Sequence, residues 1–149
     1  MKNVNDIPRL SLGLYPTPFY KLESVSERYG RDVYIKRDDL CGVALGGNKV
    51  RKLEFLLARA RLDGCDTVFT TGGAQSNHAA RLGMKSVLLL KGRDAAERRG
   101  NLILDGIYGA EVRMMDADSY EEIYAEMRRR AAELEAQGHK CCLIPLGGS

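Results

Sequence analysis

The sequence is poor in several residue types, and each shortage excludes a class of protein. Its 149 residues include no tryptophan, two histidines and four cysteines, and no two cysteines have Cys-x-x-Cys spacing. This content predicts no metal site and favours reduced thiols. The net charge of +3 is too small to indicate a nucleic-acid partner, because binding to phosphates requires a strongly basic surface.

Long apolar runs are absent as well. No stretch approaches the roughly 20 apolar residues of a membrane-spanning helix, and residues 1–14 lack the apolar segment of a signal peptide. No G-x-G-x-x-G follows a predicted strand, which argues against a Rossmann-like nucleotide binder. We therefore expect a cytoplasmic protein without a membrane partner, and its 44% of hydrophobic residues are enough for a buried core.

The clearest helical pattern follows a glycine pair, Gly46-Gly47. Asn48 is a favoured N-cap residue there, and Gly64 is a stop signal at the other end. Apolar residues recur between them at spacings of three and four, the period of a helix with one buried face; they are Val50, Leu53, Leu56, Leu57 and Ala60.

Lys49 lies in the first turn of this predicted helix, with Arg51 and Lys52 close behind it. A helix N-terminus already carries partial positive charge, so this crowding lowers the pKa of a lysine or attracts an anion. Both outcomes suit a Schiff-base lysine beside a phosphate. A solvated basic helix start is the alternative interpretation.

The rest of the chain alternates between strand and helix patterns. After an extended N-terminal segment, strands are predicted over residues 32–36, 67–71, 86–91, 111–115 and 141–145, and helices over 22–29 and 94–108. A last helix begins at Asp118 or Ser119 and ends before Gly138, and its apolar face, including Tyr120 and Tyr124, is predicted to be core. This alternation predicts an α/β fold with a parallel sheet and flanking helices.

Two charged clusters are expected to have structural and not chemical roles. Arg37, Asp38 and Asp39 are interpreted as an ion-pair cluster without a chemical role. The run 128–130 consists of three arginines in a helical pattern that also holds several glutamates, so we interpret it as a solvated face.

A second candidate site follows the predicted strand 67–71. Residues 72–78, Gly-Gly-Ala-Gln-Ser-Asn-His, combine a glycine pair with four hydrogen-bonding side chains at the start of a helix. Ligands of open α/β sheets gather beyond the carboxyl ends of the strands, and free N–H groups at a helix N-terminus bind carboxylates and phosphates. Taken alone, the loop is equally compatible with an ordinary strand-to-helix turn.

Together the two motifs are specific. Gly-Gly-Asn-Lys-Val-Arg-Lys-Leu-Glu at 46–54, followed by the motif at 72–78, resembles the family of D-cysteine desulfhydrase and 1-aminocyclopropane-1-carboxylate deaminase. Segments 15–18, 35–39 and 144–149 match this family in order and rough spacing. The resemblance implies a pyridoxal 5'-phosphate enzyme of the tryptophan-synthase-β-like fold, which is fold type II.

The resemblance also assigns roles to residues of this chain. Lys49 is similar to the lysine that forms the Schiff base and moves the α-proton, and Ser76 is expected to be catalytic with it. Asn77 matches the asparagine that hydrogen-bonds the oxygen on the pyridine ring, and Lys52 matches a lysine that helps to hold the phosphate. The expected cofactor-binding residues are thus Lys49, Asn48, Lys52 and Asn77, and the expected substrate-binding residues are Ser76, Asn77 and His78.

This chain departs from the family in two respects. It corresponds to only the first half of a family chain, with residues 1–47 expected to belong to the large domain and residues 48–149 mainly to the small α/β domain. The family's phosphate cradle lies in the other half. In addition, about seven residues are missing after His78, which shortens a helix there by nearly two turns, or ~10 Å. The crossover of residues 74–85 is then close to the minimum for parallel strands.

Three functions follow from these observations. The first is a desulfhydrase-like lyase that removes sulfide from a small amino acid such as D-cysteine and yields pyruvate and ammonia. The second is a 1-aminocyclopropane-1-carboxylate deaminase. The third is a truncated, inactive relative or one half of a split enzyme, which would be a homo-oligomer or would associate through the surface left by the missing half.

Overall fold

The computed structural model describes residues 3–43, 46–71, 82–92 and 101–148. Its helices are α1 (Glu23–Tyr29), α2 (Lys49–Leu62), α4 (Asn101–Ile107) and α5 (Tyr120–Glu135). Its strands are β1 (Phe19–Lys21), β2 (Tyr34–Lys36), β3 (Thr67–Thr70), β4 (Lys85–Lys91), β5 (Glu111–Met115) and β6 (Cys141–Ile144). Short 3-10 turns are η1 (Val4–Asp6), η2 (Asp38–Leu40) and η4 (Leu146–Gly148).

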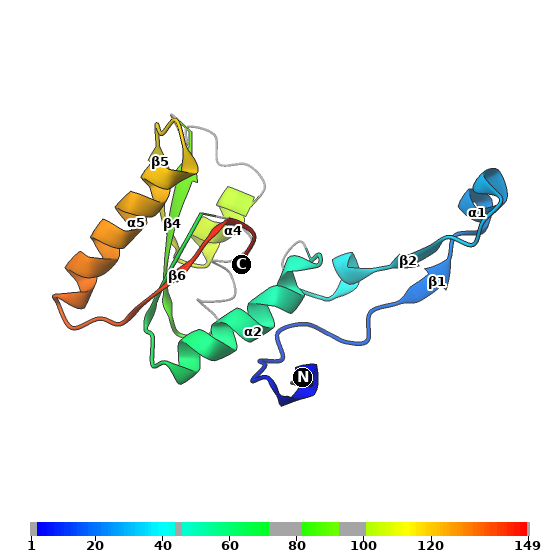
Figure 1. The fold of residues 1–149 in the computed structure, drawn as a ribbon, viewed down its shortest axis with the longest axis horizontal. Coiled ribbons are helices and arrows are strands. Elements are labelled where there is room, and N and C mark those ends of the chain that lie inside the picture. The colour runs from blue at the N-terminus through cyan, green and yellow to red at the C-terminus, as the bar shows by residue number, and fades with distance from the viewer. Residues whose placement is uncertain (1–2, 44–45, 72–81, 93–100, 149) are drawn as a thin grey trace.

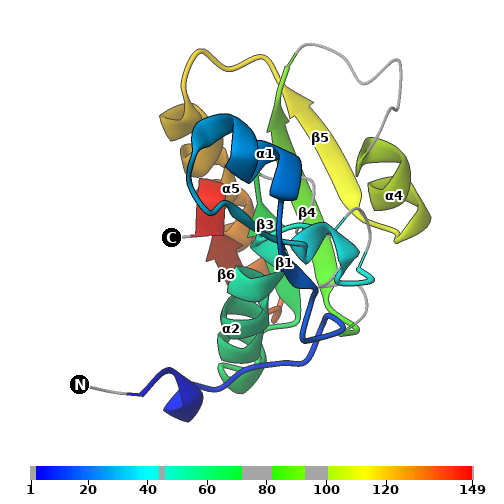
Figure 2. The same ribbon diagram turned by 90° about the vertical axis from the view of Figure 1, so that its right-hand side faces the viewer.

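A four-stranded parallel sheet forms the centre of the larger part of the molecule. Its strand order is β5-β4-β3-β6, and every neighbouring pair is parallel. Helices α2 and α4 lie on one face of the sheet and α5 lies on the other (Figures 1 and 2). The prediction of a parallel α/β sheet with flanking helices is therefore confirmed.

The two faces of the sheet bury separate apolar clusters, because successive residues of a strand point to opposite sides. On one face, Val68 packs with Leu53 and Leu57 of α2. On the other, Phe69 packs with Ile123 and Met127 of α5. This double burial explains why β3 and β4 have continuous apolar or β-branched sequences, as parallel strands covered on both faces usually do.

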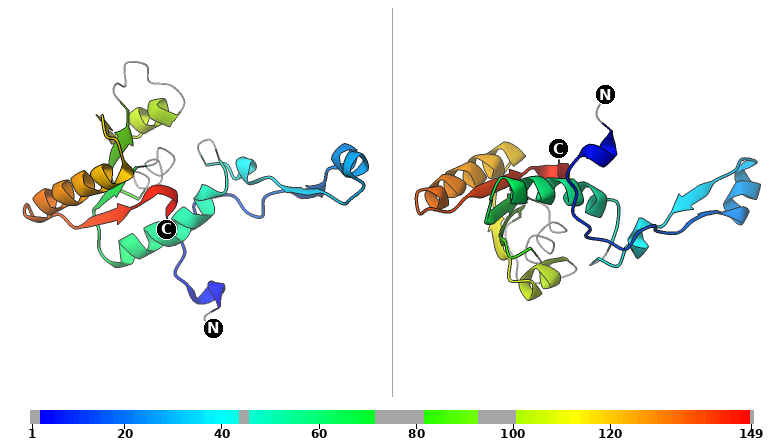
Figure 3. Two further views of the ribbon diagram at one scale, coloured as in Figure 1. Left: turned by 45° about the horizontal axis from the view of Figure 1, so that its top comes forward. Right: turned by 90° about the horizontal axis from the view of Figure 1, so that it is seen from below.

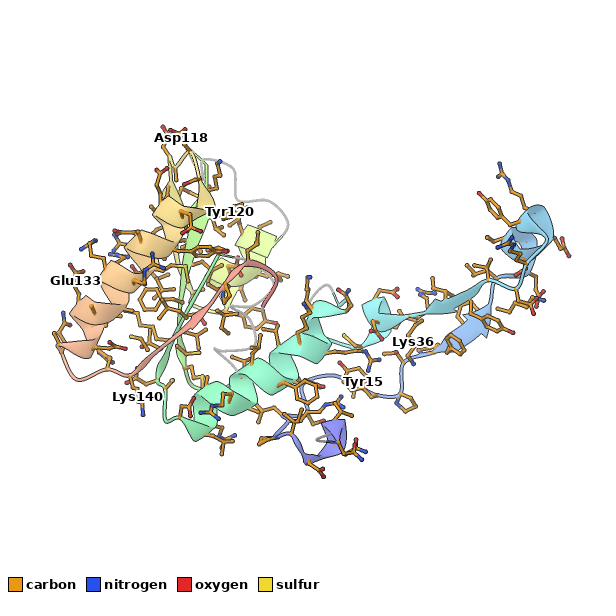
Figure 4. All side chains as sticks on the ribbon, in the orientation of Figure 1. Tyr15, Lys36, Asp118, Tyr120, Glu133 and Lys140 are labelled. Atoms are coloured by element: carbon orange, nitrogen blue, oxygen red, sulfur yellow. The ribbon has the colours of Figure 1, made fainter. Side chains whose placement is uncertain are left out.

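Helix α5 follows the sequence prediction except at its first residue. Ser119 is the N-cap and its hydroxyl accepts a hydrogen bond from the backbone N–H of Glu122, which confirms one of the two proposed caps. Tyr124 is half-buried beside the core. The prediction that Tyr120 is core is wrong, because this side chain is 42% exposed at the free end of the helix (Figure 4).

Residues 3–43 form an arm that extends away from the sheet (Figures 1 and 3). Its outer part is a two-stranded antiparallel sheet in which Phe19 of β1 lies opposite Lys36 of β2. Helix α1 connects the two strands in the chain. Strand β1 was not expected from the sequence. The rings of Phe19 and Tyr34 stack with centroids 5.3 Å apart, yet both side chains are more than half exposed.

Most other boundaries agree with the predictions to within a few residues. The predicted helix 94–108 is observed as α4, and its residues 94–100 lie outside the described part of the chain. The predicted crossover 74–85 lies mostly outside it as well. In the described residues, no helix combines the length and apolar character needed to cross a membrane.

Candidate active site

Lys49 is the first residue of α2, as the sequence predicted. Its side chain is exposed and has no hydrogen bond or ion pair with the described residues. Asn48 occupies the N-cap position, but its side chain makes no capping hydrogen bond, because its own backbone is already helical with φ −63° and ψ −19°. Asn48 therefore marks the start of the helix without capping it.

Lys52 lies one turn further along the helix and is also exposed. Its Nζ donates to the backbone carbonyl of Gly147 at 3.0 Å. Gly147 lies in η4, three residues after the last residue of β6, so this bond joins the first turns of α2 to the segment at the carboxyl end of the parallel sheet. Ligands gather at this end of open α/β sheets, and the contact therefore places Lys49 and Lys52 where a ligand is expected.

The turn before Lys49 is packed tightly against η2. A Cβ added to Gly46 would lie 2.3 Å from the carbonyl oxygen of Asp39, and the φ of Gly46 is +71°. Only glycine fits both conditions without strain. The next residue, Gly47, donates its N–H to the carbonyl oxygen of Asp38 at 2.8 Å. Gly46 is thus required by the close approach of two backbone segments, whereas Gly47 has open space at its Cβ position and is favoured by its φ of +100°.

Asp38 also holds α2 through its carboxylate. Arg51 donates to both of its oxygens, from Nε at 2.6 Å and from Nη2 at 2.7 Å. The hydroxyl of Thr17 donates to the same carboxylate at 2.7 Å. These hydrogen bonds, first that from Arg51 and then that from Thr17, hold the pKa of Asp38 well below its usual value. The prediction of a structural ion-pair cluster at Arg37–Asp39 is confirmed, and one pair reaches α2.

Glu54 is a second anchor on the same helix and is completely buried. Its carboxylate accepts hydrogen bonds from Arg9 at 2.6 Å and from the backbone N–H groups of Leu12 at 3.0 Å and Gly13 at 3.4 Å. Buried charges occur in folded proteins when they are paired in this way. Glu54 therefore fixes the path of the arm along α2.

Tyr15 lies beside α2 (Figure 4), close to the arginine partners of both anchors. The guanidinium of Arg51 lies 4.6 Å from the centre of its ring and that of Arg9 lies 5.4 Å away. Its hydroxyl is buried and has no hydrogen-bond partner in the described residues. Burial, followed by the nearby charge of Glu54, raises the pKa of Tyr15. The ring and its two guanidinium neighbours pack the arm against the start of α2.

The predicted residues Ser76, Asn77 and His78 lie outside the described residues, so their roles remain predictions. Thr71 immediately precedes this loop at the carboxyl end of β3 and is buried. Its hydroxyl has no hydrogen-bond partner in the described part of the chain. An unpaired buried hydroxyl is unusual. The hydroxyl of Thr71 lies at the carboxyl end of the sheet, where the sequence predicts a ligand-binding loop.

A hollow of about 260 Å³ lies at the opposite end of the sheet, where β4 and β5 begin. Its charged residues pair with one another: Glu111 accepts hydrogen bonds from Arg113 at 2.7 Å and from Arg130 at 3.2 Å. We interpret it as a salt-bridge network.

Arg128 and Arg129 are exposed, as predicted for a solvated run, and Arg129 pairs with Glu126. The prediction is wrong for Arg130, whose side chain is only 18% exposed because it packs toward the sheet and pairs with Glu111.

Comparison with known proteins identifies the family. Residues 10–149 match the family model described as pyridoxal-phosphate dependent enzyme. The chain belongs to this family. It is 44% identical, over 95% of its length, to a protein of Pyrococcus abyssi provisionally named 1-aminocyclopropane-1-carboxylate deaminase, and 40% identical, over its whole length, to a D-cysteine desulfhydrase of Klebsiella pneumoniae.

Solved structures give the same result. The crystal structure of an ACC deaminase homologue, 40% identical in sequence, matches 97% of this chain with a TM-score of 0.88. Diaminopropionate ammonia lyase from Escherichia coli shares the fold with a TM-score of 0.65 at 18% identity over 93% of this chain. The resemblance inferred from the two motifs is therefore confirmed, and with it the fold type.

The chain spans about half the length of its relatives. It covers 44% of the Pyrococcus abyssi protein, 48% of the Klebsiella pneumoniae enzyme and 46% of the ACC deaminase homologue. Within this half, the described residues fit a pyridoxal-phosphate site, since the exposed amine of Lys49 bonds to none of them and Lys52 offers a second cation one turn away.

Proposed function

We propose that this chain is the lysine-bearing half of a pyridoxal-phosphate lyase of the D-cysteine desulfhydrase type. The observation that carries the proposal is the setting of Lys49. Its amine is exposed and bonds to none of the described residues, and the segment on either side of it is bonded to Asp38. A Schiff-base lysine needs a free amine on a fixed backbone.

In the proposed reaction, the main contributions of this chain come from Lys49 and from residues 72–78. When bound, pyridoxal phosphate acts as an electron sink that makes the hydrogen on the substrate α-carbon acidic. The Lys49 amine would accept this proton, and Ser76, Asn77 and His78 would orient the substrate carboxylate. Asn77 would bind the pyridine oxygen, with Lys52 and Asn48 next to the phosphate. Loss of the thiol from the β-carbon and hydrolysis would then give sulfide, pyruvate and ammonia.

The runner-up substrate is 1-aminocyclopropane-1-carboxylate. The names of the relatives divide between deaminase and desulfhydrase at similar identities, 44% and 40%. The test is therefore a direct comparison of ammonia release from 1-aminocyclopropane-1-carboxylate and sulfide release from D-cysteine. Ammonia from the former without sulfide from the latter would replace the desulfhydrase proposal.

A second candidate function is that of one half of a two-part enzyme, which needs a partner for activity. The arm supports this proposal, because it leaves several large apolar side chains substantially exposed: Phe19, Tyr20, Tyr29 and Tyr34. Exposed apolar patches of this kind are typical of interaction sites. The partner would be a polypeptide equivalent to the other half of the relatives, or a second copy of this chain.

Cofactor binding is the first experiment. The purified chain is mixed with pyridoxal phosphate, its visible absorbance is recorded, and the adduct is fixed with borohydride and located by peptide mass spectrometry. We expect an absorbance band and a label on Lys49, both absent from Lys49→Ala. Equal bands in the two proteins, or labels spread over other lysines, would contradict the proposal.

A further inference from the structure

Asp38 contacts the chain on both sides of Lys49. Its backbone carbonyl accepts a hydrogen bond from the N–H of Gly47 at 2.8 Å, two residues before the lysine. Its carboxylate accepts two hydrogen bonds from Arg51, two residues after it, at 2.6 and 2.7 Å. A single residue outside α2 is therefore bonded to both flanks of the lysine.

The carboxylate of Asp38 is itself fixed. Its side chain is 14% exposed, and it accepts a third hydrogen bond from the hydroxyl of Thr17, which is buried. The carbonyl oxygen of Thr17 in turn accepts a hydrogen bond from Nζ of Lys36. A two-point guanidinium–carboxylate contact is rigid in both distance and angle, so the orientation of Asp38 is transmitted to Arg51 and to the first turn of α2.

Arg51 has little freedom of its own. Its guanidinium lies over the ring of Tyr15 at 4.6 Å and donates a further hydrogen bond to the hydroxyl of Thr17 at 3.3 Å. The orientation of the Arg51 guanidinium is therefore fixed by the Tyr15 ring against its face and by the Asp38 carboxylate at its edge. A lysine at this position could reach one oxygen but could not reproduce the planar contact.

The geometry points to Asp38 as the positioning residue of Lys49, one that fixes the flanks of the lysine and directs its amine to the carboxyl end of the sheet. This inference rests on the proposed role of Lys49 as the Schiff-base residue. Asp38 does not need to touch cofactor or substrate. It acts through Gly47 and Arg51, and its loss should loosen the start of α2 while the sheet and α5 remain folded.

The chain offers a matched control in the next residue. Asp39 lies in the same turn, carries the same charge, and pairs with Arg37 at 2.7 Å. Arg37 belongs to the arm, and its side chain also donates a hydrogen bond to the hydroxyl of Tyr20. Asp39→Asn therefore removes an equal charge and an equally short ion pair without touching α2.

The test compares the full chain with Asp38→Asn and Asp39→Asn by amide hydrogen exchange. Because the Arg51 contact is partly screened by solvent, its loss should speed exchange at Gly47 and Val50 by about fivefold. Exchange in α5 should be unchanged, and Asp39→Asn should match the wild type. Unchanged exchange at both amides in Asp38→Asn, or equal acceleration in α5, would overturn the inference.

A second measurement separates this inference from the proposed function. After borohydride fixation, the share of pyridoxal phosphate on Lys49 relative to Lys140 should fall in Asp38→Asn and not in Asp39→Asn. If wild-type Lys49 takes no label although its flanks exchange as expected, the proposed function fails and the positioning contact stands. If the label on Lys49 is the same in both variants, the positioning role fails.

Arg51→Lys covers the case in which Asp38→Asn does not fold. It keeps the positive charge and loses the planar two-point contact. We expect faster exchange at Gly47 and Val50 and a smaller label on Lys49 than in the wild type. Wild-type exchange and labelling in this variant would show that the two-point contact does not position Lys49.

Discussion

The sheet domain and the N-terminal arm are held in place by different forces. The domain, formed by residues 46–71, 82–92 and 101–148, buries apolar clusters on both faces of its sheet. The arm, residues 3–43, has one small apolar cluster at its base, where Cys41 and Val43 meet Val50 of α2. Leu10 and Leu12 of the arm also pack, partly buried, against the edge of the cluster under α2, and the polar contacts of Glu54 and Asp38 complete the attachment.

Lys49 lies where these two regions meet. The lysine begins the helix that both regions share, so one side of α2 packs on the sheet and the other binds the arm. Apolar packing is strong but tolerates small adjustments, whereas charged hydrogen bonds fix direction. The domain therefore supplies stability, and the arm supplies the orientation of the residue on which the proposed chemistry depends.

The largest expected effect is the loss of packing in the sheet domain. Phe69 is 1% exposed and packs against α5, whereas Phe19 in the arm is 64% exposed. Phe69→Ala should lower the free energy of unfolding by about 3 to 5 kcal/mol, and Phe19→Ala should change it by less than about 0.5 kcal/mol. Urea unfolding followed by circular dichroism measures both. Equal losses would mean that the arm and the domain share one core.

Replacement of Glu54 tests how strongly the arm is attached to α2. Glu54→Ala leaves the N–H groups of Leu12 and Gly13 without their acceptor and Arg9 without its partner, which should cost about 2 to 3 kcal/mol. The matched control is Glu126→Ala, which removes the same side chain from a partly exposed ion pair in α5 and should cost less than about 1 kcal/mol.

The location of the Glu54 effect is as informative as its size. Amide exchange at Leu12 and Gly13 should rise in Glu54→Ala while exchange in β3 and β4 stays slow. A uniform rise through the sheet would show instead that the arm is an integral part of the cooperative unit.

The sheet domain was predictable because its signals are local. The spacing of Val50, Leu53 and Leu57 predicts α2, and Asp118 or Ser119 predicts the start of α5. Both were confirmed. Tyr120 continues the apolar pattern of α5, which predicts a core position, but periodicity alone does not indicate how much of the first turn the core covers.

The arm was less predictable because its contacts are distant in sequence. Strand β1 is three residues long, follows Pro18, and is defined by pairing with residues 34–36. Glu54 was also missed as an anchor. One signal was available: it lies four residues after Val50 and three before Leu57, which places a carboxylate on the buried face of a helix and calls for a buried partner.

The smallest expected effect is a pH dependence that originates in Asp38. Arg51, and then Thr17, lower the pKa of its carboxyl in the folded protein relative to the unfolded chain. The unfolded state then binds more protons in the acid range, so stability falls as pH decreases. The contribution is complete above the ordinary aspartate pKa of about 3.9 and is lost as the pH falls through the lowered value.

Its size should be modest, because Arg51 is 37% exposed and solvent screens the pair. We expect the free energy of unfolding of the wild type to lose about 1 kcal/mol more than that of Asp38→Asn between neutral pH and about pH 2. Asp39→Asn should follow the wild type more closely in the same titration. Parallel pH profiles for the wild type and Asp38→Asn would mean that this carboxylate keeps an ordinary pKa. The bond from Arg51 would then be too weak to hold the start of α2, and the orientation of Lys49 would have to come from packing alone.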